Sequence, residues 1–391
     1  GVVVRCPESV DVDLSVDPAR VAPGVVIHAG CRLSGKATSI GPGCQVGREA
    51  PATLENCRLA DDVTISGGFF SGAIFMSGSS FGSCAHVRGP VVLEEYASCA
   101  HSVGLKQTFL MPHVVLGSLI NFCDCLMAGG TDRKNHSEVG SGYIHFNYTP
   151  HQDKATASLI GDVPRGVMLG QRPIFLGGQG GLIGPARIEY GTVVAAGTIC
   201  RRDVLKPGNL VLGDRARSVH EIPYDPCVIG DVSRILANNL VYIGNLHALL
   251  QWYRLVRPLY TRGNPAAEAC VDGGVDAIGQ MVEERVARLG GLVEKVKASL
   301  GVSGLEPAQG SAGPTRQGQA EFVKRWPHLE AALAGAVNAG GDSALADNFL
   351  AAAQKACRGL SYVDGIKALP AGAKQAGTAW LQSIVNSVVA L

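Results

Sequence analysis

Arg88 and Lys106 are the two cations whose spacing in this sequence is most informative about chemistry. They lie eighteen residues apart and share one position of a six-residue pattern marked by Val87, Leu93, Cys99 and Leu105. If three such units make one turn of the chain, the two side chains stack about 5 Å apart on one face. At an effective dielectric near 20, their repulsion costs roughly 3 kcal/mol. A doubly charged anion such as a diphosphate would offset that cost.

Two alternatives to an anion site remain open from the residues alone. Glu94 or Glu95 could neutralise the two cations, or both cationic side chains could extend separately into water. Neither arrangement would need a diphosphate at this position. We favour the anion site because other residues, described below, also point to a phosphorylated ligand.

The pattern that places these cations recurs through the first half of the chain. An aliphatic residue precedes a small residue and then a turn, in segments such as Val21-Ala-Pro-Gly, Ile40-Gly-Pro-Gly, Ile160-Gly-Asp and Val194-Ala-Ala-Gly. Hexapeptide repeats are typical of parallel β-helices, in which the aliphatic residue points into a triangular prism. This pattern is that of the left-handed form, an exception to the usual right-handed crossover. The sequence therefore predicts a mainly β fold, a left-handed parallel β-helix followed by an α-helical region.

Beyond residue 230 the hydrophobic period changes to that of helices. Apolar residues recur at helical spacing over residues 235–253, and a second helical run spans Ala267–Leu300. The side chains expected on a solvated face of this second run are Glu283, Glu284, Arg285 and Arg288. Residues 302–319, rich in Gly, Pro, Ser and Gln, predict a linker. We therefore divide the chain into a β-helix (1–230), a helical extension (231–301), the linker (302–319) and a helical C-terminal region (320–391).

Composition excludes several classes of protein and site. The net charge is +1, so the chain as a whole attracts neither nucleic acid nor an anionic membrane. No segment is long and apolar enough to span a bilayer, and no signal peptide is evident. The 12 scattered cysteines are typical of reduced thiols in a cytoplasmic protein. Cys123 and Cys125 are too close for ordinary zinc-ligand spacing, so no metal site is expected.

From Arg88 to Val204 the sequence resembles the acetyltransferase domain of bifunctional bacterial enzymes that make UDP-N-acetylglucosamine from glucosamine 1-phosphate. In that family an Arg and a Lys eighteen residues apart bind the substrate phosphate and uridyl end, and Arg88 and Lys106 match both in type and spacing. Asn147 and Tyr148, followed by Lys154, resemble the family's Asn-Tyr pair and sugar-binding Lys. The segment with Ala195, Ala196 and Gly197 resembles the stretch that lines the family's acetyl-CoA groove.

Two departures from the family are visible. The family's catalytic histidine lies in Gly-His-Leu, twelve residues after the Lys, where this chain has Gly117-Ser118-Leu119. A serine cannot act as a general base near neutral pH. A nearby substrate-binding Tyr of the family is Asn121 here. The family's N-terminal pyrophosphorylase domain, with its Gly-rich nucleotide loop, has no counterpart in this sequence, so uridylyl transfer is not expected.

Two histidines are candidates for the missing catalytic base. His136 ends a six-residue insertion relative to the family, Thr131–His136, where a loop could reach over the site. His145 lies a hexad step from Val139 and is expected to point into the prism. The alternative that no base is present stays open. Other histidines on nearby coils are expected to be structural or to bind ligand: His86, His101, His113 and His151.

The resemblance implies a homotrimeric cytoplasmic acyltransferase that moves an acetyl group from acetyl-CoA to a nucleotide- or phosphate-linked amino sugar. Acetyl-CoA would lie between neighbouring β-helices. A competing hypothesis is a catalytically silent trimer that binds a sugar nucleotide as a scaffold or regulator. Loss of the family's histidine favours this second hypothesis, whereas the retained ligand-binding residues disfavour loss of all binding. A separate nucleotidyltransferase chain could also be a partner, and no metal cofactor, nucleic acid or membrane is expected.

Overall fold

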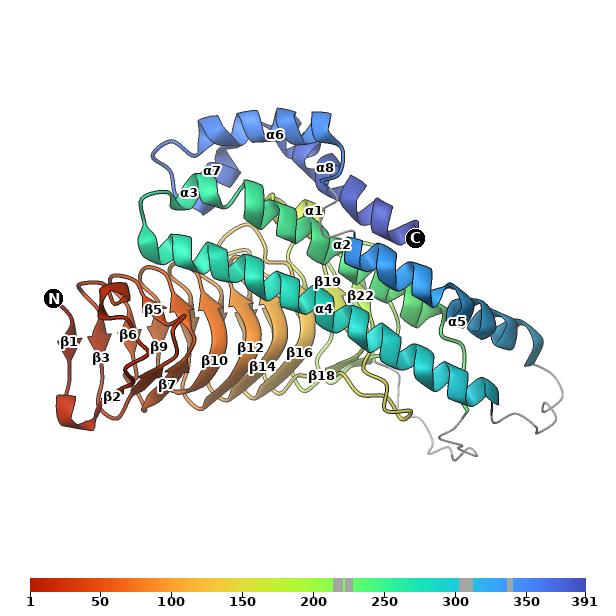
Figure 1. Ribbon diagram of the computed structural model, residues 1–391, viewed down its shortest axis with the longest axis horizontal. Helices are drawn as coiled ribbons and strands as arrows, with labels where there is room; N and C mark the ends of the chain where they lie inside the picture. The colour runs from red at the N-terminus through yellow and green to blue at the C-terminus, as the bar shows by residue number, and fades with distance from the viewer. Residues whose placement is uncertain (214–220, 222–227, 302–311, 336–339) are drawn as a thin grey trace.

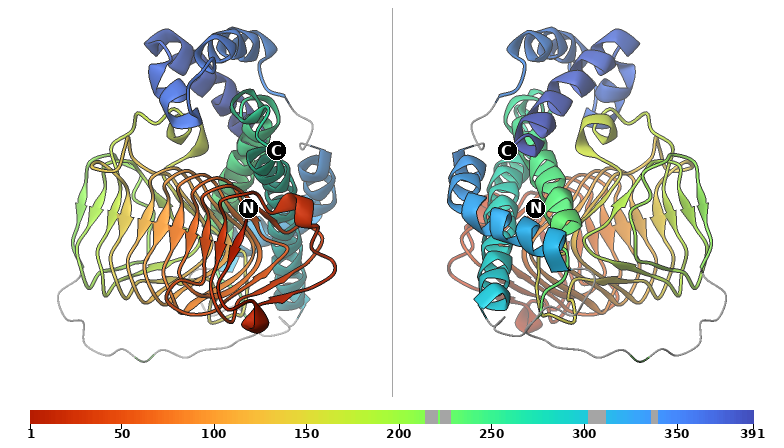
Figure 2. Two further views of the ribbon diagram at one scale, coloured as in Figure 1. Left: turned by 90° about the vertical axis from the view of Figure 1, so that its left-hand side faces the viewer. Right: turned by 90° about the vertical axis from the view of Figure 1, so that its right-hand side faces the viewer.

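The first half of the chain is a parallel β-solenoid, and helices lie along one side of it (Figure 1). The computed structural model describes residues 1–213, 221, 228–301, 312–335 and 340–391. Each strand pairs in parallel with the equivalent strand of the next turn. The end-on views of Figure 2 show the coils stacked behind one another. The predicted fold class, a left-handed parallel β-helix followed by helices, is confirmed.

Three faces make up the solenoid. Among the described residues, face 1 is an 11-stranded sheet of β1 (Val3–Val4), β3 (Val26–Ile27), β6 (Gln45–Val46), β9 (Thr64–Ile65), β11 (Ser80–Phe81), β13 (Ser98–Cys99), β15 (Val115–Leu116), β17 (Glu138–Val139), β20 (Phe175–Leu176), β23 (Val193–Val194) and β25 (Leu210–Val211). Face 2 contains β2 (Asp11–Val12), β4 (Arg32–Ser34), β7 (Ala52–Glu55), the first parts of β10 (Gly68–Phe75), β12 (Ala85–Leu93), β14 (Val103–Leu110) and β16 (Ile120–Met127), and β18 (Ile144–Phe146), β21 (Gly181–Ile183) and β24 (Ile199–Cys200). Face 3 contains β5 (Ser39–Ile40), β8 (Arg58–Leu59), the last parts of those four long strands, β19 (Ser158–Ile160) and β22 (Arg187–Ile188).

The core of the solenoid consists of inward-facing residues that stack from turn to turn. On face 2, Val87, Leu105 and Phe122 are paired in register and are fully or almost fully buried. Burying one such side chain contributes about 1.5–3 kcal/mol, so the aliphatic repeat holds the turns in step. Because side chains alternate along a strand, residues 88 and 106 then point outward.

Helices cover face 3. They are α1 (Val163–Gly166), α2 (Ser233–Leu255), α3 (Pro258–Thr261), α4 (Pro265–Gly301), α5 (Ala312–Gly335), α6 (Ser343–Ala356), α7 (Tyr362–Ala368) and α8 (Ala371–Val389), with 3-10 turns at Pro7–Ser9 and Pro18–Arg20. Helix α4 runs along the solenoid and contacts β5, β8, β10 and β12, while α2 contacts β19 and packs against α4 and α8 (Figure 1). Within the described ranges, none of these helices has the length and apolarity needed to cross a membrane.

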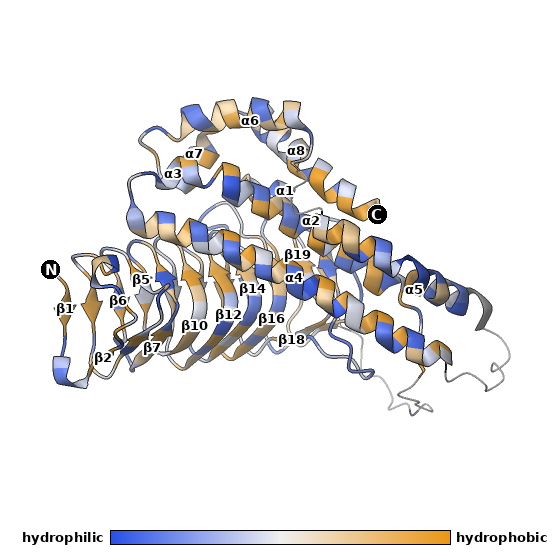
Figure 3. Cartoon of the chain, in the orientation of Figure 1, coloured by the Kyte–Doolittle hydropathy of each residue, from blue (hydrophilic) through white to orange (hydrophobic). Residues whose placement is uncertain are grey.

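Helix α2 is buried on nearly all sides. Residues 238–240 and 242–253 are all buried, and both apolar and polar residues occur along the length of the helix (Figure 3). Its polar residues bind the solenoid: Asn239 donates a hydrogen bond of 2.8 Å to the carbonyl of Ala155, and Asn245 accepts one of 2.8 Å from the amide of Val163. The helical region therefore shares a core with the β-helix.

Helix α5 begins inside the segment predicted as a linker. Residues 302–311 lie outside the described part of the chain, but α5 starts at Ala312, so residues 312–319 are helical. Gln319 donates hydrogen bonds to the carbonyls of Ile229 and Gly230, and the buried Phe322 and Trp326 follow on the same helix. These contacts offset the poor helix propensity of the Gly- and Gln-rich start.

A buried ionic cluster joins the helices to the solenoid. Arg257, 1% exposed, lies 2.9 Å from a carboxylate oxygen of Glu95 and 3.9 Å from one of Glu94. Tyr253 donates a hydrogen bond of 2.8 Å to Glu94, and the guanidinium of Arg257 lies 3.8 Å from the ring centre of Tyr362. Burial raises the pKa of Glu94 to about 7. The cluster links one corner of the prism to α2 and α7.

Three buried histidines have lowered pKa values, so we expect acid to destabilise this fold. Burial lowers the pKa values of His113, His145 and His247 to about 4, below the value of about 6.5 in an unfolded chain. Between pH 6.5 and 4 the unfolded chain binds more protons, so the stabilisation present above pH 6.5 is lost as the pH falls. Each group contributes roughly 1–3 kcal/mol. The raised pKa of Glu94 acts in the opposite direction and offsets part of this loss.

Urea unfolding at pH 7 and at pH 4.5 measures this dependence. We expect a lower free energy of unfolding at pH 4.5, and a smaller difference between the two pH values in a His145→Gln variant. Equal stability of the wild-type chain at both pH values would contradict the prediction.

Candidate functional site

Arg88 and Lys106 form a row of cations on face 2. The two residues are paired in register, with Ser71 before them and Cys123 after them. Arg88 is exposed and Lys106 is half-buried, and neither side chain has a hydrogen bond or an ion pair to any part of the chain that the structure describes. The row therefore consists of two stacked cations that the described residues leave uncompensated.

The alternative in which Glu94 or Glu95 neutralises this row is wrong. Both carboxylates belong to the cluster around Arg257, on the helix-covered side of the solenoid. The anion that would bind between Arg88 and Lys106 remains a prediction.

Asn121 lies on the same face, in register with Gly104 of the preceding turn and Ile144 of the following one. Its side chain is exposed, and its Oδ1 atom accepts a hydrogen bond of 3.2 Å from the thiol of Cys123. Burial raises the pKa of that thiol to about 11, so it stays protonated and acts as a donor. The side chain of Asn121 is thus oriented next to the cation row.

Asn147 is held at the edge between faces 2 and 3 by a buried ion pair. Its Nδ2 atom donates a hydrogen bond of 2.8 Å to Asp124, whose other carboxylate oxygen lies 2.7 Å from a guanidinium nitrogen of Arg285. The prediction of Arg285 on a solvated face is wrong, because this residue is 2% exposed. Helix α4 packs on the solenoid at this point, and the carboxylate of Asp124 compensates the buried charge.

Tyr148 and Lys154 lie in the segment that follows Asn147, between β18 and β19. The side chain of Tyr148 is 56% exposed and Lys154 is also exposed. Lys295 of α4 donates a hydrogen bond of 2.8 Å to the carbonyl of His151 and so anchors the segment. The structure therefore places all the residues predicted to bind the sugar phosphate on face 2 or on its edge with face 3.

The two predicted bases lie elsewhere. His136 is in the loop between β16 and β17, at the edge between faces 3 and 1, with Nδ1 2.9 Å from the carbonyl oxygen of Arg133 and Nε2 3.6 Å from Glu138. His145 points into the prism, as its hexad step predicts, and its Nε2 atom lies 2.8 Å from the hydroxyl of Ser158. It is only 2% exposed, so it cannot reach a ligand bound outside the prism.

The edge between faces 1 and 2 carries a Ser–His pair. The hydroxyl oxygen of Ser118 lies 3.0 Å from Nδ1 of His101, one turn of the solenoid before it. The amide of Leu119 donates a hydrogen bond of 3.1 Å to the carbonyl of His101, which keeps the two turns aligned. A signal for this contact exists in the sequence, because a spacing of seventeen residues is close to one coil.

Ala195, Ala196 and Gly197 form the same edge in a later turn, between β23 and β24. A Cβ atom at Gly197 would meet no atom within 4 Å, so a ligand can approach this backbone closely. The adjoining hollow is lined by Gly197, Thr198 and the exposed Arg201 and Arg202. An open backbone beside two arginines fits a ligand with several phosphates, as acetyl-CoA has.

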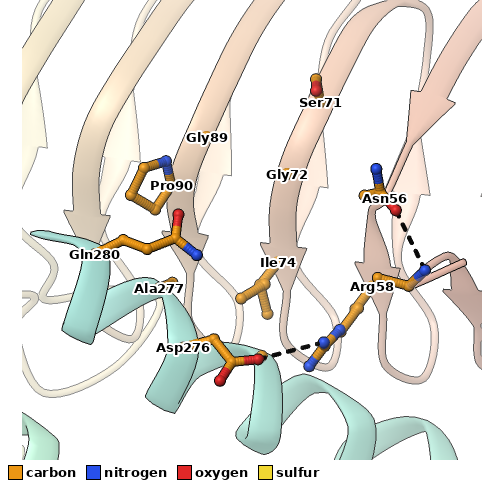
Figure 4. Close-up of a pocket in the computed structure, with 12 residues that line it drawn as sticks. Asn56, Arg58, Ser71, Gly72, Ile74, Gly89, Pro90, Asp276, Ala277 and Gln280 are labelled. Carbon is orange, nitrogen blue, oxygen red and sulfur yellow. Dashed lines mark hydrogen bonds and ion pairs between the residues drawn. The ribbon is translucent and has the colours of Figure 1, made fainter. Parts of the chain in front are cut away.

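Another hollow lies between α4 and the edge of faces 2 and 3 in earlier turns (Figure 4). Arg58 faces Asp276 across it at 3.6 Å and donates a hydrogen bond to the carbonyl of Ala269. Gly72 and Gly89 leave the solenoid backbone bare on the opposite side. Because the charge of Arg58 is already paired, this hollow adds no free cation to the row formed by Arg88 and Lys106.

Comparison with known proteins identifies relatives of this chain. No family model matches it. It is 28% identical over 205 residues to Bifunctional protein GlmU from Pelobacter propionicus, a match that covers 52% of this chain and 39% of that protein. It is 28% identical over 220 residues to GlmU from a Cyanothece species (56% and 43% covered) and 30% identical over 189 residues to GlmU from Thermus thermophilus (48% and 36% covered). The chain thus spans about two fifths of the length of the curated relatives it matches. The predicted resemblance is confirmed, and this β-solenoid protein is a relative of the GlmU proteins.

Proposed function

We propose that this chain is a hexapeptide-type acyltransferase that moves an acetyl group from acetyl-CoA to the amino group of a sugar carrying a phosphate or a nucleotide. The observation that carries this proposal is the in-register pair of Arg88 and Lys106 on an exposed strand face. Two stacked cations that no described carboxylate compensates favour a ligand with phosphate groups. Similarity to the GlmU proteins supports the same class of ligand.

Each predicted ligand contact has a proposed role. Arg88 and Lys106 bind the phosphates, and Asn121 contacts the ligand from the next turn of face 2. Asn147 and Lys154 orient the sugar. Tyr148 packs near the acyl group. The hydrogen bond from Asn147 to Asp124 fixes the side chain before the ligand arrives, which lowers the entropic cost of binding.

Acetyl-CoA is the proposed acyl donor, and the proposed assembly is a cytoplasmic homotrimer. The donor would lie along Ala195, Ala196 and Gly197, with its phosphates near Arg201 and Arg202. In a trimer, the exposed edge of one prism faces a neighbouring prism and closes a groove between them.

Acetyl transfer needs a group that removes a proton from the attacking amine. The amine nitrogen forms a bond to the thioester carbonyl carbon, the carbon–sulfur bond breaks, and the proton passes to the departing thiolate of coenzyme A. Of the two predicted bases, the buried His145 is unsuitable. His136 remains a candidate only if a neighbouring protomer presents it to face 2, because in its own chain it lies at a different edge from Arg88 and Lys106.

A second candidate function is a catalytically silent trimer that binds a sugar nucleotide as a scaffold or regulator, alone or with a separate nucleotidyltransferase chain. The observation that favours it is Ser118, which occupies the position of the catalytic histidine in the resembling family.

Two measurements on the full chain separate these functions. The first is thermal shift with UDP-N-acetylglucosamine and with acetyl-CoA, each alone. The second is release of free thiol from acetyl-CoA in the presence of glucosamine 1-phosphate or UDP-glucosamine. Binding of both ligands with thiol release is expected for the acyltransferase. Binding of the nucleotide sugar alone, without thiol release, would replace the proposal by the silent trimer, and binding of neither would overturn both.

A further inference from the structure

We propose that His101 is the catalytic base of this chain and that Ser118 positions it. This inference rests on the proposed acyltransferase function and names the group that accepts the proton. The contact that motivates it is the distance of 3.0 Å between Nδ1 of His101 and the hydroxyl oxygen of Ser118, on adjacent turns of the solenoid.

The chemistry of this contact leaves one ring nitrogen available. Nδ1 of His101 binds the hydroxyl of Ser118, and among the described residues no side chain binds Nε2. If Nδ1–H donates to the serine oxygen, Nε2 carries the lone pair that a base needs. The amide of Ser118 in turn donates a hydrogen bond of 3.1 Å to the hydroxyl of Ser141, so three successive turns hold the pair in place. His101 is exposed at the edge between faces 1 and 2.

The position of His101 suits a ligand held by the cation row. His101 precedes β14, and Lys106 lies further along the same strand, with Asn121 of the next turn on the same outer face. Five residues at about 3.3 Å each separate the two Cα atoms by at most roughly 16 Å. An extended sugar nucleotide is long enough to contact both residues at this separation.

The other histidines of these turns differ from His101 in burial, in position or in hydrogen bonding. His113 is buried and stacks on Tyr96 with ring centres 5.4 Å apart, and His86 stacks on Phe69 at the same separation. His136 faces Glu138 at another edge, and His145 is inside the prism. His86 is exposed too, but among the described residues no hydrogen bond holds either of its ring nitrogens. In these described turns, His101 is therefore the exposed imidazole whose ring nitrogen is held by a side-chain hydrogen bond, at one edge of face 2.

In the proposed step, Nε2 of His101 takes a proton from the acceptor amine as its nitrogen bonds to the carbonyl carbon of acetyl-CoA. The carbon–sulfur bond then breaks, and the imidazolium returns that proton to the thiolate. The products are the acetylated amine and coenzyme A with a free thiol, so the imidazole ends in its starting state.

The test is thiol release from acetyl-CoA by wild-type chain and by His101→Gln, with glucosamine 1-phosphate and UDP-glucosamine as acceptors. We expect His101→Gln to lose about 10²–10⁴-fold in kcat. Its thermal shifts with acetyl-CoA and UDP-N-acetylglucosamine should match those of the wild type. The decline of activity at acid pH, where the base is protonated, should also disappear in this variant. Ser118→Ala should lose about tenfold, the equivalent of one neutral hydrogen bond.

Two further variants make the outcome decisive. His328→Gln changes an exposed histidine on α5, outside the site, and should keep wild-type activity. Adding Ser118→His to His101→Gln places an imidazole on the adjacent turn and should restore part of the activity. If wild-type chain releases thiol and His101→Gln does so equally well, the role of His101 is refuted while the acyltransferase stands. If His136→Gln loses activity and His101→Gln does not, the base is His136. Absence of thiol release from the wild type overturns both proposals.

Discussion

Replacing Arg257 with methionine is expected to lower the free energy of unfolding by about 3–5 kcal/mol, because it leaves carboxylates buried without their cation. Arg257 contacts Glu94 and Glu95, and Glu94 is fully buried. The methionine side chain fills much of the same space, so most of the loss reflects the uncompensated charge.

The pH dependence of this variant identifies the cause. The pKa of Glu94 is about 7 even with Arg257 present, and removing the cation raises it further. At pH 6 Glu94 of the variant binds a proton, so no unpaired charge is buried. At pH 8 the folded variant must either bury an unpaired carboxylate or keep the proton on Glu94 at a free-energy cost that grows with pH. Urea unfolding should show a larger loss at pH 8 than at pH 6.

Arg262→Met is the matched control, because Arg262 is exposed and lies just beyond α3. It should change the free energy of unfolding by less than about 0.5 kcal/mol. An equal loss in Arg257→Met at both pH values would indicate that packing, and not the ionic cluster, is responsible.

Removing both cations of the face-2 row is expected to weaken binding of UDP-N-acetylglucosamine by about 10²–10⁴-fold. Each charge-assisted hydrogen bond contributes about 1.5–3 kcal/mol, and the Arg88→Ala/Lys106→Ala double variant loses one at each position. Stability without ligand should not fall, because in the described residues neither side chain is paired and their mutual repulsion is removed. Titration calorimetry measures the affinity and thermal unfolding measures the stability.

The Arg32→Ala/Lys36→Ala variant removes one arginine and one lysine from an earlier turn, where both residues are exposed. It should leave the affinity unchanged. A loss of affinity equal to that of the first double variant would mean that overall charge, and not the in-register row, attracts the ligand. Arg88→Lys should lose part of the affinity, because an ammonium cannot make the bidentate contact of a guanidinium.

The geometry of the cation row could be predicted from the sequence alone. In a solenoid, the hexad fixes both which residues point inward and how many residues make one turn, so Arg88 and Lys106 had to share a row once Val87 and Leu105 shared the core. The same local rule placed His145 inside the prism. Such inferences succeed because they depend on residues close together along a periodic chain.

The hexad rule could not predict the contacts between the helices and the solenoid. Arg285 meets Asp124 across 161 residues, and Arg257 meets Glu95 across 162. The sequence of its own helix places Arg285 among charged residues and so predicts that it is exposed. The packing of α4 on the solenoid is what buries it. The helical start of α5 likewise depends on the contact between Gln319 and residues 229–230.

The aliphatic hexads by themselves determined the solenoid, its register and the row of two cations, because every turn repeats the same local geometry. The tertiary structure decided which charges are compensated and which imidazole lies beside Ser118. Those outcomes depend on how separate turns and helices meet, since a buried charge and an oriented ring each need a partner that no local pattern specifies.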